Sequence, residues 1–117
     1  MTRATALITV FNEQTWIAQA VHSLLNQTLV DIEILVIDDG STDNTKQIAS
    51  ALNTNVIKNE NNRGAGYSLQ KGLNHIHNNT NYNYILTLDA DGQHNIKDAK
   101  KLIKTANQNP EALLVYG

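Results

Sequence analysis

Two carboxylates, Asp89 and Asp91, follow directly after an apolar run at residues 84–88. Acids at the carboxyl end of a buried strand put negative charge where open α/β sheets bind ligands. Two carboxylates one residue apart are also natural oxygen ligands for a hard divalent cation such as Mg²⁺ or Mn²⁺. A cation held there can bind a diphosphate group, which the carboxylates alone would repel. The spacing therefore predicts a metal-dependent diphosphate site.

The same two acids also fit a second interpretation. Gly92 permits a tight turn out of the strand, and a helical pattern begins near Asn95. Asp89 and Asp91 could therefore cap that helix instead of binding a metal. An Asp-x-Asp pattern does not decide between the two by itself, because a short motif needs a structural context.

Apolar strands alternate with amphipathic helices along the sequence. Strands are predicted at residues 5–10, 32–37, 55–58 and 82–88, and a fifth starts at 112–116. Helices are predicted at 15–27, 65–78 and 96–107, with a further helix start at 41–43 and a helix stop at Pro110. Apolar strands separated by helices indicate a parallel sheet covered on both faces. The predicted fold class is α/β, Rossmann-like, with a mostly parallel sheet and helices on both faces.

Polar side chains follow two of the other strands. Asn12-Glu13 comes after the first strand, and Asp38-Asp39 comes after the second. Because parallel strands end at one edge of a sheet, we expect both pairs to converge with the later acidic pair on one crevice. Each pair is also compatible with an ordinary loop or a helix cap.

Length and composition limit the classes of function. The 117 residues predict one domain, 1–117, and the net charge of −2 gives no electrostatic basis for binding nucleic acid. The absence of cysteine excludes disulfides, thiolate metal sites and a cysteine nucleophile. No apolar run approaches the length of a membrane span, and the N-terminus does not have the pattern of a signal peptide. We therefore expect a cytoplasmic domain.

Four short motifs stand at the predicted strand ends and before the third helix. They are Val10-Phe11-Asn12-Glu13, Val36-Ile37-Asp38-Asp39-Gly40-Ser41-Thr42-Asp43, Asn61-Asn62-Arg63-Gly64-Ala65-Gly66 and Asp89-Ala90-Asp91-Gly92. In this order they resemble the motifs of inverting family 2 glycosyltransferases with a GT-A fold. The resemblance runs from about residue 6 to residue 117, and it implies the donor-binding half of such an enzyme.

The resemblance implies roles for individual residues. The implied nucleotide-sugar-binding positions are Phe11, Asn12, Glu13, Asp38, Asp39, Arg63, Gly64, Asp89, Ala90 and Asp91. Asp39, or its neighbour Asp38, would accept a hydrogen bond from the nucleobase, and Glu13 would lie beside the base and ribose. Arg63 would offer a cationic fork to the diphosphate or base, although it also fits a solvated surface charge. Gly64 would let the backbone pass close to the nucleotide.

The resemblance also implies a cofactor and a substrate class. Asp91 would bind Mn²⁺ or Mg²⁺ directly, Asp89 would bind the metal or the ribose, and Gln93 would complete the set of metal ligands. The donor would be a UDP- or GDP-linked sugar. The string from Asp89 to His94 is most similar to polyprenyl- or dolichyl-phosphate mannosyl- and glucosyltransferases. The acceptor would then be a polyprenyl phosphate or a growing glycan, and a full-length form would sit peripherally at the inner membrane face.

The sequence departs from the family in length. Family members carry a further acceptor-binding segment, which supplies the acid that deprotonates the acceptor hydroxyl. No residue here is a good candidate for that general base, so the catalytic residue is unknown. We expect a chain truncated at its carboxyl end that binds donor without efficient transfer. We also expect its apolar edge at 112–116 to be prone to self-association.

Two other functions stand as alternatives. A non-catalytic nucleotide-sugar-binding module would use the same residues without turnover. A haloacid dehalogenase-type phosphatase also carries an Asp-x-Asp-Gly loop, but after its first strand and before Thr or Val. In this sequence the loop follows the fourth strand and precedes Gln93. Binding of a nucleoside diphosphate with Mn²⁺ and without phosphate release would favour the transferase or the module.

Overall fold

The computed structural model describes residues 3–28, 31–89 and 96–109. Strands and helices alternate in this part of the chain: β1 (Arg3–Val10), α1 (Ile17–Leu25), β2 (Asp31–Asp38), α2 (Thr45–Ser50), β3 (Asn55–Lys58), α3 (Ala65–Asn79), β4 (Tyr84–Asp89) and α4 (Ile96–Gln108). Every element predicted between residues 5 and 107 is present, with ends that shift by a few residues. The strand and self-associating edge predicted at 112–116, and Pro110, lie outside the described residues.

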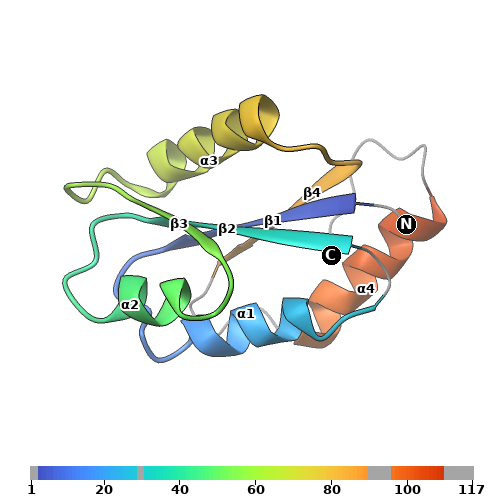
Figure 1. Cartoon of the computed structure of the whole chain (residues 1–117), viewed down its shortest axis with the longest axis horizontal. Coiled ribbons are helices and arrows are strands. Elements are labelled where there is room, and N and C mark those ends of the chain that lie inside the picture. The colour runs from blue at the N-terminus through green and yellow to red at the C-terminus, as the bar shows by residue number, and fades with distance from the viewer. Residues whose placement is uncertain (1–2, 29–30, 90–95, 110–117) are drawn as a thin grey trace.

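The sheet has the order β3-β2-β1-β4, and all of its strand pairs are parallel. Figure 1 shows α3 on one face of the sheet and α1, α2 and α4 on the other. This arrangement confirms the predicted fold class. It also explains why β1 is apolar along its length: the strand is central, and its residues 4–8 are all buried.

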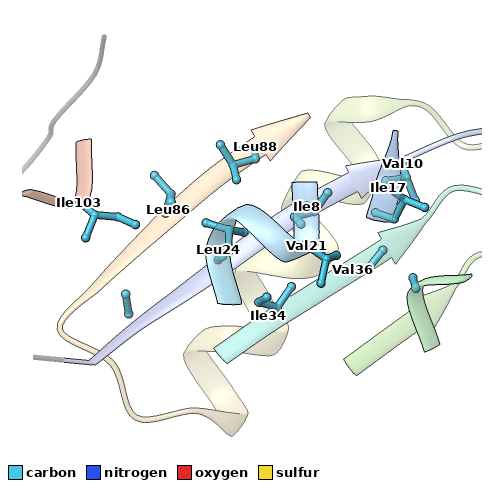
Figure 2. Close-up of a cluster of buried hydrophobic side chains, with 13 residues drawn as sticks. Ile8, Val10, Ile17, Val21, Leu24, Ile34, Val36, Leu86, Leu88 and Ile103 are labelled. Atoms are coloured by element: carbon cyan, nitrogen blue, oxygen red, sulfur yellow. The ribbon is translucent and has the colours of Figure 1, made fainter. Parts of the chain in front are cut away.

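Two apolar clusters hold the layers together. The larger cluster lies between the sheet and α1 (Figure 2). In it, Ile17, Val21 and Leu24 of the helix pack with Ile8 and Val36 of the strands. These three residues belong to the apolar stripe that the 3.6-residue period predicts, whereas Trp16 and Leu25 of the same stripe are 41% and 37% exposed.

The smaller cluster lies under α3 and joins Leu7, Leu35 and Ile37 of the sheet to Ile76 of the helix. The helix approaches β1 closely at Gly72, where a Cβ atom would lie 2.4 Å from Cδ1 of Leu7.

None of the helices in the described ranges combines the length and hydropathy that crossing a membrane requires.

Candidate functional site

The carboxyl ends of three strands meet at one edge of the sheet. In the parallel register, Val10 of β1 lies beside Asp38 of β2, and Thr9 of β1 lies beside Asp89 of β4. The loops that follow these strands therefore start side by side. This is the convergence expected for the carboxyl edge of an open α/β sheet.

Hydrogen bonds join the loop after β1 to the loop after β2. The backbone N–H of Asn12 donates to Oγ of Ser41 at 2.8 Å, and Oδ1 of Asn12 accepts from the backbone N–H of Thr42 at 2.8 Å. Asn12 has a left-handed backbone, with φ of 52°, which Asn tolerates better than most residues. The Asn12 carboxamide thus holds the second loop in place, a role that its assignment to ligand binding does not include.

The same two loops are joined again at the start of α2. The backbone N–H of Glu13 donates to Oγ1 of Thr45 at 2.9 Å, and the N–H of Gln14 donates to Oδ2 of Asp43 at 3.3 Å. Asp43 also accepts from the backbone N–H of Thr45 at 2.9 Å and from its hydroxyl. Burial raises the pKa of Asp43, but these hydrogen bonds outweigh it and keep the pKa below its ordinary value of 3.8. Within the segment 41–43, which the sequence predicts as a helix start, Asp43 therefore does accept hydrogen bonds from the first residue of the helix. The helix itself begins at Thr45.

Asp38, the last residue of β2, is fully buried. Its Oδ1 accepts from the backbone N–H of Ser41 at 2.9 Å, which closes the turn through Gly40. Within the part of the chain that the structure describes, its Oδ2 has no hydrogen-bond partner. Its burial and its hydrogen bond to the turn give Asp38 a structural role at the end of β2.

Asp39 joins the loop after β2 to the segment before α3. Its Oδ1 accepts from the backbone N–H of Arg63 at 2.8 Å and from Nδ2 of Asn59 at 2.9 Å, and its Oδ2 accepts from the N–H of Gly64 at 2.9 Å. Burial raises the pKa of Asp39, but hydrogen bonds from Arg63, Asn59, Gly64 and Ser68 together keep the pKa below its ordinary value of 3.8. The residue as a whole is 5% exposed. It is ionised at neutral pH and holds the segment from residue 59 to residue 64 against the edge of the sheet.

Two glycines make this close approach possible. Gly40 has φ of +78°, and a Cβ there would lie 2.7 Å from the backbone carbon of Asn61. Gly64 has φ of +96° and precedes the first residue of α3, with open space around its missing Cβ. Gly40 therefore has both a steric and a conformational reason to be glycine, whereas Gly64 has only the conformational one.

Tyr67, on the first turn of α3, carries two cations over its ring. Cζ of Arg63 lies 5.2 Å from the ring centre, and Nζ of Lys71 lies 6.0 Å from it. The Arg63 side chain therefore makes a cation–π contact with Tyr67, although the residue is exposed. The spacing of four residues between Tyr67 and Lys71, which puts both on one helix face, is the signal in the sequence that could have identified this group.

Two more features border the edge. Phe11 leaves 42% of its surface exposed directly after β1. A cavity of about 280 Å³ opens on the α3 face of the sheet, lined by Leu7, Thr9, Ala65, Gly66, Leu69, Thr87 and Leu88. The cavity lies between the start of α3 and the ends of β1 and β4, so it adjoins the strand end at which Asp89 stands.

The predicted metal ligands are placed only in part. Asp89 is the last residue of β4. Ala90, Asp91 and Gln93 lie outside the described residues. Among the residues that the structure does describe, no group of three or more His, Cys, Asp or Glu side chains could hold a metal ion. The geometry of a metal site therefore stays a prediction.

Comparisons with known proteins give a consistent result. A family model described as "Glycosyl transferase family 2" matches residues 5–117. An uncharacterized protein of Methanocaldococcus jannaschii is 33% identical over an alignment of 118 positions, which covers 96% of this chain and 50% of that protein.

Solved structures resemble the chain in fold. The structure of Staphylococcus aureus TarS 1–349 in complex with UDP has a TM-score of 0.66 and 26% identity, over 90% of this chain and 32% of that one. Glucosyl-3-phosphoglycerate synthase from Mycobacterium tuberculosis, in complex with Mn²⁺, UDP and glucosyl-3-phosphoglycerate, has a TM-score of 0.61 and 26% identity, over 76% of this chain and 33% of that one. The chain spans half or less of the length of each of these proteins.

Proposed function

Since the chain belongs to glycosyl transferase family 2, as the match over residues 5–117 shows, we propose that it binds a nucleoside-diphosphate sugar as the donor half of an inverting sugar-transfer site. The observation that carries this proposal is the meeting of three strand ends at one edge, with Asp39 holding the loop before α3 in place. Such an edge is where open α/β sheets bind nucleotides.

In this proposal the base lies over the ends of β1 and β2. Oδ2 of Asp39 accepts one hydrogen bond, from Gly64, and retains acceptor capacity for an N–H of the base. The exposed ring of Phe11 offers an apolar surface beside it, and Asn12 and Glu13 border the ribose side. Asp38 supports the turn through its hydrogen bond from the backbone N–H of Ser41.

The diphosphate lies toward the ends of β1 and β4. The donor set of Asp89, Asp91 and Gln93 is made of oxygen atoms, which fits a hard cation such as Mn²⁺ or Mg²⁺. When bound there, the cation would offset the charge of the diphosphate and stabilise the nucleoside-diphosphate leaving group. Arg63, whose guanidinium contacts the ring of Tyr67, adds positive charge on the base side of this region. The two related structures with UDP, one of them also with Mn²⁺, support this part of the proposal.

The acceptor is the less determined half of the proposal. The chain spans half of the archaeal relative's length, and the proposal assigns none of the described residues to acceptor binding or to the general base. A polyprenyl-phosphate acceptor rests on the string from Asp89 to His94 alone, and the relatives reported above carry other descriptions. A binding module without turnover, which would use the same residues, is the second candidate. The phosphatase alternative fails because its motif belongs after the first strand, whereas Asp89 ends β4.

A thermal-shift panel of UDP, GDP, CDP and dTDP, each with and without Mn²⁺, tests donor binding. A ligand present at 100 times its Kd should stabilise the fold by roughly 2.7 kcal/mol, which is easily measured. We expect one nucleobase to dominate and the shift to depend on Mn²⁺. The matching nucleosides are the control, since they lack the diphosphate and should shift the transition without any effect of Mn²⁺. The absence of a shift with all four diphosphates would contradict the proposed function.

A further inference from the structure

Lys71, in the middle of α3, makes a contact that its position in the sequence does not explain. Its Nζ donates a hydrogen bond to Oδ1 of Asn59 at 2.8 Å, although the two residues belong to different elements. The ammonium group also lies 6.0 Å from the ring centre of Tyr67. The Lys71 side chain is therefore directed toward the loop before α3 and away from bulk solvent.

Asn59 is buried, with 3% of its surface exposed, and both ends of its carboxamide are used. Oδ1 accepts from Lys71, while Nδ2 donates to Oδ1 of Asp39 at 2.9 Å and to Oγ of Ser68 at 3.1 Å. The backbone N–H of Asn59 donates to the carbonyl oxygen of Asp38 at 2.8 Å. The side chain thus forms a continuous link from a cation on α3 to the carboxylate at the end of β2.

The chemistry of the two ends permits only one orientation of this carboxamide. A lysine ammonium only donates hydrogen bonds, and an ionised carboxylate only accepts them. If the carboxamide were flipped, its NH₂ would face the NH₃⁺ of Lys71 and its oxygen would face the carboxylate of Asp39. Each contact would then be repulsive in a buried place where water cannot relieve it. The cation also polarises the amide, which strengthens the hydrogen bond that Nδ2 gives to Asp39.

We propose that Lys71 is a positioning residue for nucleobase recognition, which acts by fixing the orientation of the Asn59 carboxamide so that Asp39 keeps one geometry. This inference rests on the proposed function, because it assigns the base to Asp39. Lys71 itself does not touch the base.

The other charged groups around Asp39 do not duplicate this role. Arg63 reaches Asp39 through its backbone N–H, and its guanidinium lies over Tyr67 instead. Asp38, the neighbour on the same strand, is buried and directs Oδ1 to the turn at Ser41. Among the described residues, Lys71 is thus the cation that is linked to Asp39 through one side chain, that of Asn59, by two successive hydrogen bonds.

The test uses Lys71→Met, which removes the charge and keeps the apolar stem, and Lys71→Arg, which restores a donor. Lys58→Met is the matched control, since Lys58 is exposed, adjacent to Asn59 in sequence, and loses the same charge. NMR measures the titration midpoint of the Asp39 carboxyl carbon in the free protein. Calorimetry measures the affinity for the nucleoside diphosphate that binds the wild type, with and without Mn²⁺.

In Lys71→Met we expect the Asp39 midpoint to rise by about half a pH unit or more. We expect the nucleoside diphosphate to bind about five- to tenfold more weakly, with the same dependence on Mn²⁺. Lys71→Arg should restore most of both properties, and Lys58→Met should change neither. If the affinity is unchanged in Lys71→Met, the inference about Lys71 is overturned, even if the Asp39 midpoint moves, but the proposed function is not affected. A wild type that binds no nucleoside diphosphate overturns the proposed function, and the recognition role of Lys71 with it.

A second measurement decides the case in which Lys71→Met does not fold. In the wild type, the two Nδ2 protons of Asn59 should exchange slowly with water, because both are donated inside the protein. The exposed amide of Asn78 serves as the reference for fast exchange. Exchange of the Asn59 protons at the rate of Asn78 would show that the carboxamide is not held, and would overturn the inference.

Discussion

The backbone N–H of Asn12 donates a hydrogen bond to Oγ of Ser41 at 2.8 Å, and this bond ties the loop after β1 to the loop after β2. The tie is reciprocal, because Oδ1 of Asn12 accepts from the backbone N–H of Thr42. Two loops that are far apart in the sequence thus behave as one rim. A change on one side of the rim should therefore be felt on the other.

Asn12→Ala should destabilise the fold by about 2 kcal/mol, because it removes the acceptor for Thr42 and leaves alanine in a left-handed backbone. Asn12→Gly should lose only about 1 kcal/mol, since glycine accepts that conformation. Urea unfolding measures both. Asn53→Ala is the control, because Asn53 is exposed with φ of 59° and reports the backbone strain alone. Equal stability of Asn12→Ala and Asn53→Ala would show that the side-chain hydrogen bond contributes nothing.

The two glycines with positive φ should respond differently to alanine. Gly64→Ala should destabilise the fold by about 2 kcal/mol, because its backbone (φ 96°, ψ 159°) is one that essentially only glycine adopts, although there is open space around the missing Cβ. Gly40→Ala should destabilise it by about 3 kcal/mol, because its Cβ would also meet the backbone of Asn61 and Asn62. Thermal unfolding of the two variants, measured side by side, provides the comparison. Similar losses in both would mean that the loop before α3 moves away easily.

Stability should fall in acid. The pKa values of Asp39 and Asp43 lie below 3.8 in the folded state, despite burial, because hydrogen bonds favour the ionised forms. Groups with a lowered pKa contribute stability that is present above about pH 4 and is lost as the pH falls through the folded pKa. Urea unfolding at pH 5, 4 and 3 should therefore show a decline, and the decline should be shallower in Asp39→Asn. Glu60→Gln, at an exposed position, removes one acidic charge without removing any of these hydrogen bonds and serves as the control. A slope in Asp39→Asn as steep as in the wild type would show that Asp39 does not contribute.

Leu7 and Gly72 should be energetically coupled. Gly72→Ala should destabilise the fold by about 1–3 kcal/mol, because the new methyl group meets Leu7. In a Leu7→Ala background the same change should become neutral or stabilising by up to about 1 kcal/mol, since the space is vacated and alanine favours a helix. A double-mutant cycle by chemical denaturation measures the coupling. Additive effects would indicate that α3 shifts on the sheet to accept the methyl group.

Asp91→Asn should weaken the binding of the diphosphate without weakening the binding of the base. The change removes one negative charge and keeps the shape, so a nucleoside diphosphate should bind at least tenfold more weakly in the presence of Mn²⁺, while the nucleoside should bind nearly as before. Asp39→Ala should weaken both, because the proposed contact is to the base. Titration calorimetry distinguishes the two patterns. Equal Mn²⁺-dependent affinity in wild type and Asp91→Asn would remove Asp91 from the metal site.

The fold was predictable because its signals are periodic and local. The apolar run at 4–8 and the stripe of Ile17, Val21 and Leu24 are patterns that one sequence displays directly. The convergence of Asn12, Asp38 and Asp89 at one edge followed from the parallel order of the strands. What the sequence could not supply is which polar atoms pair with each other.

Asn59 and Lys71 illustrate that limit. Twelve residues separate them, and nothing in their types or spacing predicts that the ammonium of one orients the carboxamide of the other. The role of Asn12 was missed for the same reason, because its partner Thr42 is thirty residues away. Side-chain pairing between loops depends on loop geometry, and periodicity does not encode loop geometry.

The position of β4 has a consequence for how the chain folds. β4 pairs with β1, and Arg3 and Asn83, eighty residues apart, are joined by two hydrogen bonds there. During synthesis at 5–20 residues per second, the edge of β1 that receives β4 stays unpaired for roughly 4–16 seconds after β1 is made. That edge belongs to a buried apolar strand, which is a template for unwanted strand addition. Refolding of the whole chain should show the same order for a different reason, because the β1–β4 pairing closes a much longer loop than the β1–β2 pairing. Pulse-labelled hydrogen exchange during refolding should find the amides shared by β1 and β2 protected before those shared by β1 and β4.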